Sequence, residues 1–172
     1  MKKYLVFSLV AGALALTACG KKDESSAAAP AASAPTAAAA APAAPAVAVI
    51  ELTANDSMKF SATHFEVAAG QEVKVVFTNM GTMPKVAMGH NFVLLKKGTD
   101  LKAFADAAVA AAATDYVPAS KADEVIAHTK LLGPKQTEEI TFKAPTEPGE
   151  YPFICSFPAH FLTGMKGVIV VK

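Results

Sequence analysis

The segment from Cys155 to Met165 reads Cys-Ser-Phe-Pro-Ala-His-Phe-Leu-Thr-Gly-Met and places a thiol, an imidazole and a thioether within eleven residues. One strand pattern ends near Cys155, and another begins near Gly167. The segment between them is therefore expected to be a loop that folds all three side chains onto one point. A second imidazole, His90, follows Gly89 at the start of another strand pattern.

Together these side chains are the donor set of a type 1, or blue, copper site. Thiolate and thioether sulfur suit Cu(I), whereas imidazole nitrogen suits both oxidation states. Each residue alone has an ordinary alternative, because a lone Cys or Met more often packs in a core. The combination predicts one copper ion, cycling between Cu(I) and Cu(II), with a ligand set of His90, Cys155, His160 and Met165.

The remaining pattern is all-β. Alternating apolar and polar residues predict strands over 64–67, 72–77, 91–95, 139–142 and 167–171. The alanine-rich stretch from Asp100 to Ala113 carries apolar residues near helical spacing and predicts a helix inserted between strands. Short strands at this spacing indicate a β-sandwich with Greek-key connections.

The N-terminus has the features of an exported protein. Two lysines precede an apolar run from Tyr4 to Leu16, which is too short to span a bilayer. The tetrapeptide that ends in Cys19 resembles a bacterial lipobox. This predicts a lipoprotein signal peptide over 1–18 and acylation of Cys19 with fatty acids such as palmitate. The alternative is an ordinary secretory signal with an incidental cysteine.

A low-complexity stretch follows. Residues 25–48 contain 15 alanines and 4 prolines, and the prolines recur too often for a helix to propagate. We expect a lipidated, Ala/Pro-rich disordered tether over 19–48, and a folded domain over 49–172.

The charge pattern excludes one class of partner. The 16 basic residues are all lysine, and with 15 acidic residues the formal net charge is +1. Without arginine, bidentate recognition of phosphates or base edges is not expected. Nucleic acid is therefore not a predicted partner.

Several motifs resemble those of the azurins, single-domain cupredoxins. The matching segments are Met88–Asn91, Val125–Leu131, Cys155–His160 and Met165–Gly167. The resemblance runs from about Ile50 to Lys172 and implies an eight-stranded Greek-key β-sandwich with one inserted α-helix. With the lipobox and the tether, it points to the lipid-modified azurins of bacterial outer membranes.

The resemblance also implies roles for neighbouring residues. The Gly89 carbonyl becomes a weak fifth ligand, and the Asn91 side chain ties the His90 segment to the Cys155 loop. The backbone N–H groups of Asn91 and Phe157 point at the Cys155 sulfur. We further expect a docking surface for redox partners around His160, made of Met83, Ala87, Met88, Ala159, Phe161 and Leu162.

Two departures from azurin stand out. Four residues separate His160 from Met165, where azurin has three and auracyanin-like cupredoxins have four. Azurin also has a disulfide near its N-terminal strands. If Cys19 is lipidated and Cys155 binds copper, no cysteine is left for it, so other interactions must compensate for about 2–5 kcal/mol.

The predicted function is transfer of single electrons by a monomeric protein, anchored through Cys19 to the outer membrane, with its domain in the periplasm or at the cell surface. Transient partners would be redox proteins such as cytochromes or copper enzymes. The main alternative is a copper carrier or buffering lipoprotein. An enzyme with Cys155 as nucleophile is less favoured, because no orienting Asp or Asn is evident and Met165 would have no role.

Overall fold

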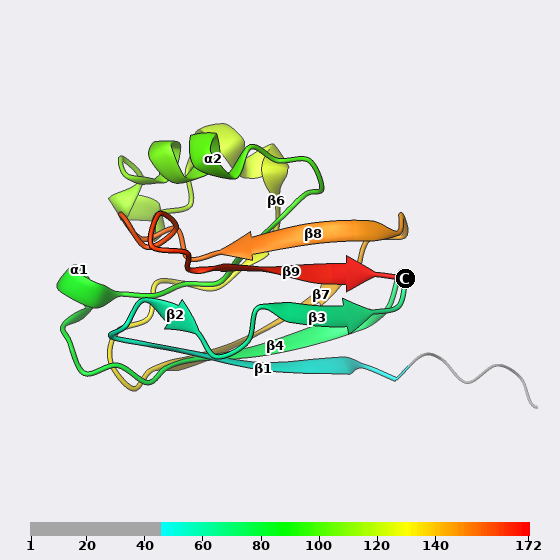
Figure 1. Ribbon diagram of the computed structural model, residues 1–172, viewed down its shortest axis with the longest axis horizontal. Helices are drawn as coiled ribbons and strands as arrows, with labels where there is room; N and C mark the ends of the chain where they lie inside the picture. The colour runs from blue at the N-terminus through cyan, green and yellow to red at the C-terminus, as the bar shows by residue number, and fades with distance from the viewer. Residues whose placement is uncertain (1–45) are drawn as a thin grey trace, which may run out of the picture. The chain divides into compact units, whose positions relative to one another are not determined.

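The computed structural model describes residues 46–172, in which nine strands form two facing sheets (Figure 1). The predicted signal peptide and most of the predicted tether lie outside the described residues. One sheet has the order β2 (Lys59–Phe60), β1 (Ala48–Asn55), β4 (Glu72–Asn79) and β7 (Thr137–Lys143). The other has the order β3 (His64–Val67), β9 (Lys166–Val171), β8 (Gly149–Ile154), β5 (Val93–Leu95) and β6 (Val125–His128).

Both sheets are mixed. β1 pairs in parallel with β4, and β3 pairs in parallel with β9, whereas the other pairs are antiparallel. The register brings the end of β4 beside the start of β7, and the start of β5 beside the ends of β6 and β8. The segments that follow β4, β6 and β8 therefore meet at one end of the sandwich, which we call the site end.

The core lies between the sheets and follows from the alternation within strands. In β4, Val73, Val75 and Phe77 are fully buried, while the residues between them are half-buried. Phe153 of β8 contacts the rings of Phe60, Phe65 and Phe92 with centroids 5.2–6.0 Å apart. Aromatic packing of this kind accompanies extensive burial of apolar surface, which stabilises the sandwich.

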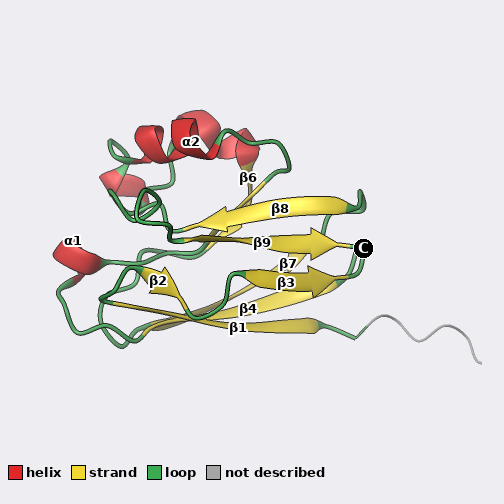
Figure 2. Cartoon of the chain, in the orientation of Figure 1, coloured by secondary structure: helices red, strands yellow, loops and turns green. Residues whose placement is uncertain are grey.

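Helices are short and lie outside the sandwich (Figure 2). α1 (Lys85–Met88) is one turn at the site end, and α2 (Leu101–Ala108) packs Phe104 against Val93, Leu95 and Ile154. The Asp100 carboxylate caps α2 by accepting from the Ala103 N–H. Two 3₁₀ segments follow, Ala112–Thr114 and Ala119–Glu124. Within residues 46–172, no helix combines the length and hydrophobicity needed to cross a bilayer.

The sandwich predicted from the sequence is confirmed. Nine strands replace the expected eight when the two-residue β2 is counted. The inserted helix ends at Ala108, five residues earlier than predicted, and the chain continues in 3₁₀ turns. Val109 is 57% exposed, so the stretch after Ala108 lacks the buried apolar side chain that would extend the helix.

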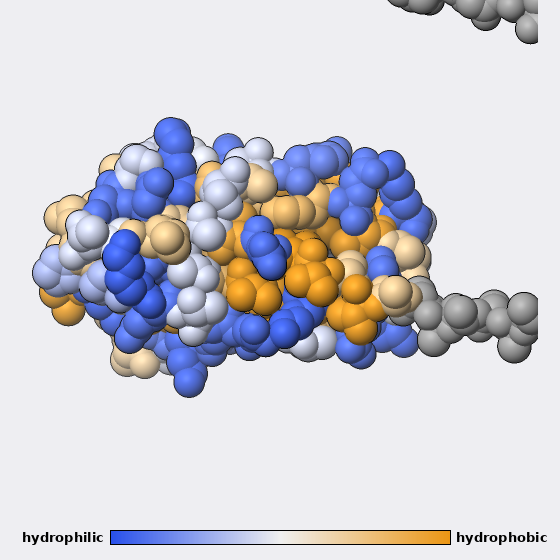
Figure 3. All heavy atoms as spheres, turned by 90° about the horizontal axis from the view of Figure 1, so that it is seen from below, coloured by the Kyte–Doolittle hydropathy of each residue, from blue (hydrophilic) through white to orange (hydrophobic). Residues whose placement is uncertain are grey.

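Hydrophobic side chains also gather on the surface below β1 and β4, near the start of the described chain (Figure 3). Val47 and Val49 are 47% and 60% exposed there. Val49 lies on the outward side of β1, because Ile50 and Leu52 point inward. These valines lie at the opposite end of β1 from the site end.

Candidate metal centre

Three buried side chains converge at the site end. One ligand atom each from His90, Cys155 and His160 lies within 4.8 Å of the others. The Cys155 sulfur is 3.4 Å from His160 Nδ1 and 3.9 Å from His90 Nδ1. The three side chains are at most 2% exposed, so the cluster is shielded from water.

The loop after β8 positions two of these residues. Cys155 directly follows β8, and a series of tight turns reverses the chain before β9. The His160 N–H donates to the Phe157 carbonyl, and the Met165 N–H donates to the His160 carbonyl. The Cys155 N–H in turn donates to the Met165 carbonyl at 3.1 Å. Met165 is fully buried, so its backbone closes the loop on Cys155 while its side chain stays inside.

His90 is held from another part of the chain. Its backbone exchanges two hydrogen bonds with Leu132, at 3.1 and 2.8 Å, and the Asn79 side chain donates to the same Leu132 carbonyl. Gly89 is needed before it, because a Cβ there would lie 2.7 Å from the Lys85 carbonyl and 2.8 Å from Leu131. The close approach of α1 to the 129–132 segment therefore requires glycine.

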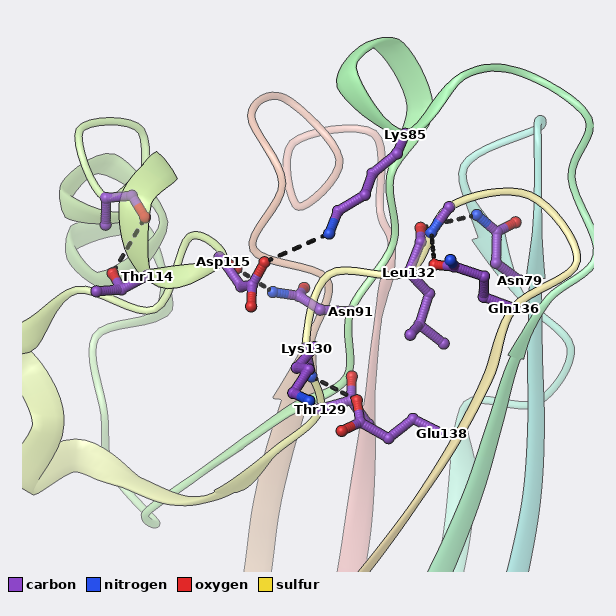
Figure 4. Close-up of polar contacts among 12 residues, drawn as sticks. Asn79, Lys85, Asn91, Thr114, Asp115, Thr129, Lys130, Leu132, Gln136 and Glu138 are labelled. Atoms are coloured by element: carbon purple, nitrogen blue, oxygen red, sulfur yellow. Dashed lines mark hydrogen bonds and ion pairs between the residues drawn. The ribbon is translucent and has the colours of Figure 1, made fainter.

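Asn91 joins the two parts. Its Nδ2 donates to Ser156 Oγ at 2.8 Å and to the Asp115 carbonyl at 2.9 Å, and its Oδ1 accepts from the Ser156 N–H at 2.8 Å. Figure 4 shows Asn91 facing the Asp115 segment, whose carboxylate lies 3.7 Å from Lys85 Nζ. Asn91 is fully buried, so these bonds lock the His90 segment to the residue after Cys155.

The electrostatics favour neutral groups at the cluster. Burial raises the pKa of the Cys155 thiol to about 12, although the backbone N–H groups of Asn91 and Phe157 donate to its sulfur and act in the opposite direction. Burial, with a smaller contribution from His90, lowers the pKa of His160 to about 4. Both His160 and the thiol are thus uncharged at neutral pH, and a bound cation would have to stabilise the thiolate.

Burial also lowers the pKa of His90, against the effects of the Asn55 carbonyl and the Asp56 carboxylate. The Nε2 atom of His90 is buried and makes no well-formed hydrogen bond, and the Asn55 carbonyl is the acceptor that it faces. Since the Nδ1 atoms of both histidines face the Cys155 sulfur, they are the nitrogens available to a metal.

The expected docking surface is exposed to different degrees. Met83 is 41% and Leu162 70% exposed, and Ala87 and Ala159 are also exposed. Met88 and Phe161 are half-buried, and Phe161 packs against the cluster that contains Phe104.

Two exposed apolar side chains near this surface were missed. Val86 is 87% and Met80 is 50% exposed. α1 turns Val86 outward between Lys85 and Ala87, and such a one-turn helix has no periodic signal in the sequence. We call the exposed set, comprising Met80, Met83, Val86, Ala87, Ala159 and Leu162, the apolar patch.

The fold and the site define a class of protein. A β-sandwich of mixed sheets that buries a histidine, a cysteine and a second histidine at one end, with a methionine buried in the same loop, is a cupredoxin with a type 1 copper centre. The residues present fit copper, because two neutral imidazoles and one thiol that can become a thiolate are its preferred donors.

The chain belongs to the plastocyanin/azurin family of copper binding proteins, whose family model matches residues 47–172. It is 37% identical to azurin of Alcaligenes faecalis over an alignment of 123 residues, which covers 70% of this chain and 94% of that azurin. It is also 39% identical to outer membrane protein H.8 of Neisseria meningitidis over 109 residues, 62% of this chain and 58% of the relative. A crystal structure of auracyanin from Roseiflexus castenholzii is 39% identical and covers 72% of this chain and 96% of that one, with a TM-score of 0.65.

Family membership confirms three predictions from the sequence. The chain is an azurin-type cupredoxin, its cofactor is a copper ion, and it is an electron carrier of this family rather than an enzyme.

Proposed function

We propose that the chain is a membrane-tethered blue copper protein that shuttles single electrons, with copper held by His90, Cys155, His160 and Met165. The observation that carries the proposal is the buried cluster whose ligand atoms lie within 4.8 Å of one another. Copper bound there supplies a one-electron couple between Cu(I) and Cu(II).

The surrounding residues have distinct roles in this proposal. The imidazoles stay neutral and offer their Nδ1 lone pairs, and the Cys155 thiol loses its proton when the metal binds. The backbone N–H groups of Asn91 and Phe157 then stabilise the thiolate, which favours the reduced state of the site. The Gly89 carbonyl acts as a weak fifth ligand. Asn91 fixes the distance between the two ligand-bearing segments.

Partners dock on the apolar patch, which combines exposed residues of the loop that carries His160 with exposed residues of the 80–87 segment. Such contacts between electron-transfer proteins are small and short-lived. Cytochromes and copper enzymes are the partners proposed, and the protein acts as a monomer.

The N-terminal segment anchors the domain to the outer membrane. In this proposal, residues 1–18 are removed, Cys19 is acylated, and residues 19–48 form the tether that carries the domain in the periplasm or at the cell surface. The relatives named outer membrane protein H.8 support this location. The test is labelling of cells with radioactive palmitate. Label should enter the protein and the membrane fraction, and Cys19→Ser should abolish both; unlabelled protein would refute the anchor.

The function is tested by adding Cu(II) to the metal-free protein and recording the visible spectrum, with Cys155→Ser as control. An intense blue charge-transfer band that the control lacks, followed by reversible one-electron titration, is the expected result. A copper carrier would instead bind copper without a stable couple, or release it rapidly to a chelator. Burial of all three clustered ligands argues against such rapid exchange.

A further inference from the structure

The chain segments that carry the apolar patch have charged side chains of one sign. The segments 80–92, 129–136 and 155–166, which meet at the site end, contain four lysines and no acidic residue. The four lysines are Lys85, Lys130, Lys135 and Lys166. By contrast, the whole described chain is almost balanced, since its lysines are distributed among a similar number of acidic residues.

Two of these lysines are held beside the apolar patch by specific contacts, and a third adjoins it in sequence. Lys135 Nζ donates to the Met80 carbonyl at 2.6 Å. Lys166 Nζ lies 5.3 Å from the centroid of the Phe161 ring, a cation–π contact next to Leu162. Lys85 immediately precedes the most exposed apolar side chain of the patch. All three lysines are exposed, so their charges face an approaching partner.

Three carboxylates near these segments already make hydrogen bonds or an ion pair. The Asp56 carboxylate accepts from the Thr82 N–H at 2.9 Å and from the Thr82 hydroxyl at 2.8 Å. Asp115 faces Lys85 at 3.7 Å, in an exposed pair that neutralises little in water. Glu138 accepts from the Lys130 N–H. These carboxylates keep their negative charges. Within residues 46–172, however, Lys135 and Lys166 take part in no ion pair, so they are the lysines beside the patch without a carboxylate partner.

We propose that the apolar patch and its lysine rim, which consists of Lys85, Lys135 and Lys166, select a redox partner whose docking face has an apolar centre surrounded by carboxylates. This rests on the proposed electron-transfer function and names the chemistry of its partner. Complementary charge raises the rate of encounter and suppresses wrong partners. A second copy of this chain fits poorly, because a two-fold contact would place the lysine rims against each other.

The first test uses the copper-loaded full chain and two small one-electron reductants of opposite charge. Hexacyanoferrate(II) is an anion and hexaammineruthenium(II) is a cation; each gives one electron to Cu(II) and becomes the trivalent complex. Raising the salt concentration from about 10 mM to 0.5 M should slow reduction of the protein by the anion about tenfold, because salt screens the charges of the lysine rim. The rate of reduction by the cation should stay unchanged or increase. Equal salt responses for the two reagents would overturn the proposal. If neither reagent reduces the protein, the electron-transfer function itself fails.

A matched pair of double variants assigns the effect to the rim. Lys135→Glu with Lys166→Glu should slow reduction by hexacyanoferrate(II) about tenfold at low salt. Lys96→Glu with Lys143→Glu makes the same change in net charge at exposed positions away from the site end, and should change the rate less than about twofold. Equal effects of the two double variants would refute a role for the rim.

A readout that needs no copper uses hexacyanochromate(III), a paramagnetic anion, and the amide signals of the metal-free protein. Signals of Met80, Val86 and Leu162 should broaden first, and the rim double variant should abolish this broadening. Uniform broadening over the surface would contradict the proposal.

Discussion

Replacement of Asn91 by alanine should cost the metal-free protein about 4 kcal/mol of unfolding free energy. The variant removes three hydrogen bonds, of 2.8, 2.8 and 2.9 Å, from a fully buried side chain. The Ser156 N–H loses its acceptor in the interior, which costs about 2 kcal/mol, and Ser156 Oγ and the Asp115 carbonyl each lose a donor worth about 1 kcal/mol.

The assay is guanidinium unfolding followed by circular dichroism. With a slope of about 4 kcal/mol per molar denaturant, the midpoint should fall by about 1 M. Asn55→Ala is the matched control, because the exposed Asn55 side chain bonds only within its own turn, to Ser57, and its loss should cost less than about 1 kcal/mol. A loss below about 1.5 kcal/mol for Asn91→Ala, or equal losses for the two variants, would refute the claim that Asn91 locks the two ligand-bearing segments together.

Three further predictions follow from the same geometry. Gly89→Ala should lower both the free energy of unfolding and the affinity for copper, because the added Cβ would lie 2.7 Å from the Lys85 carbonyl oxygen of α1. Gly164→Ala is the control: its Cβ would meet open space, so only the positive φ of 91° should lower its stability, and titration of both variants with Cu(II) compares them. Leu162→Glu should slow electron transfer to protein partners about tenfold while the blue band and the unfolding midpoint stay unchanged, since this side chain is 70% exposed. Copper loading should raise the thermal midpoint of the native chain and leave that of Cys155→Ser much less changed, because a ligand stabilises the state that binds it; equal shifts in calorimetry would place the metal elsewhere.

The loop from Cys155 to Met165, here called the metal loop, could be predicted because its chemistry is local. Cys155, His160 and Met165 lie within eleven residues between two strand patterns, and any hairpin-like loop of this length brings them close. His90 could be added because its Met-Gly-His-Asn context resembles the azurins. What the residues could not show is how His90 is held, since its bridge partner Leu132 lies 42 residues further along the chain and is an ordinary apolar residue in sequence.

Other features depend on backbone geometry without a sequence signal. The Asp115 carbonyl reaches Asn91 because Asp115 and Tyr116 both adopt left-handed conformations, with φ of 54° and 62°. Non-glycine residues seldom do so, and alanine-rich sequence before them predicts a continuing helix instead. Packing of the Tyr116 ring edge against Phe157, with centroids 5.1 Å apart, helps to hold this turn against the site. Tertiary contacts thus override local propensity where the chain meets the metal loop.

β1 is held in the sandwich without a disulfide within the described residues. Cys155 is the free cysteine of the described residues, so no covalent link joins β1 to the rest of the sandwich there. β1 pairs with β4 over seven residues and buries Ile50 and Leu52, each worth about 1.5–3 kcal/mol, so non-covalent contacts hold it in the sandwich.

The two ends of β1 are then tied by side chains. At its start, Gln71 Nε2 donates to the Ala46 carbonyl at 2.7 Å and its Oε1 accepts from the Ala68 N–H at 2.9 Å, which limits fraying where the chain enters the sandwich. Immediately after its last residue, the Asp56 carboxylate holds the 80–83 loop through Thr82, and the Asn55 carbonyl faces the His90 ring. Because β1 supports one side of the candidate metal centre in this way, the non-covalent interactions that hold β1 also help to position His90.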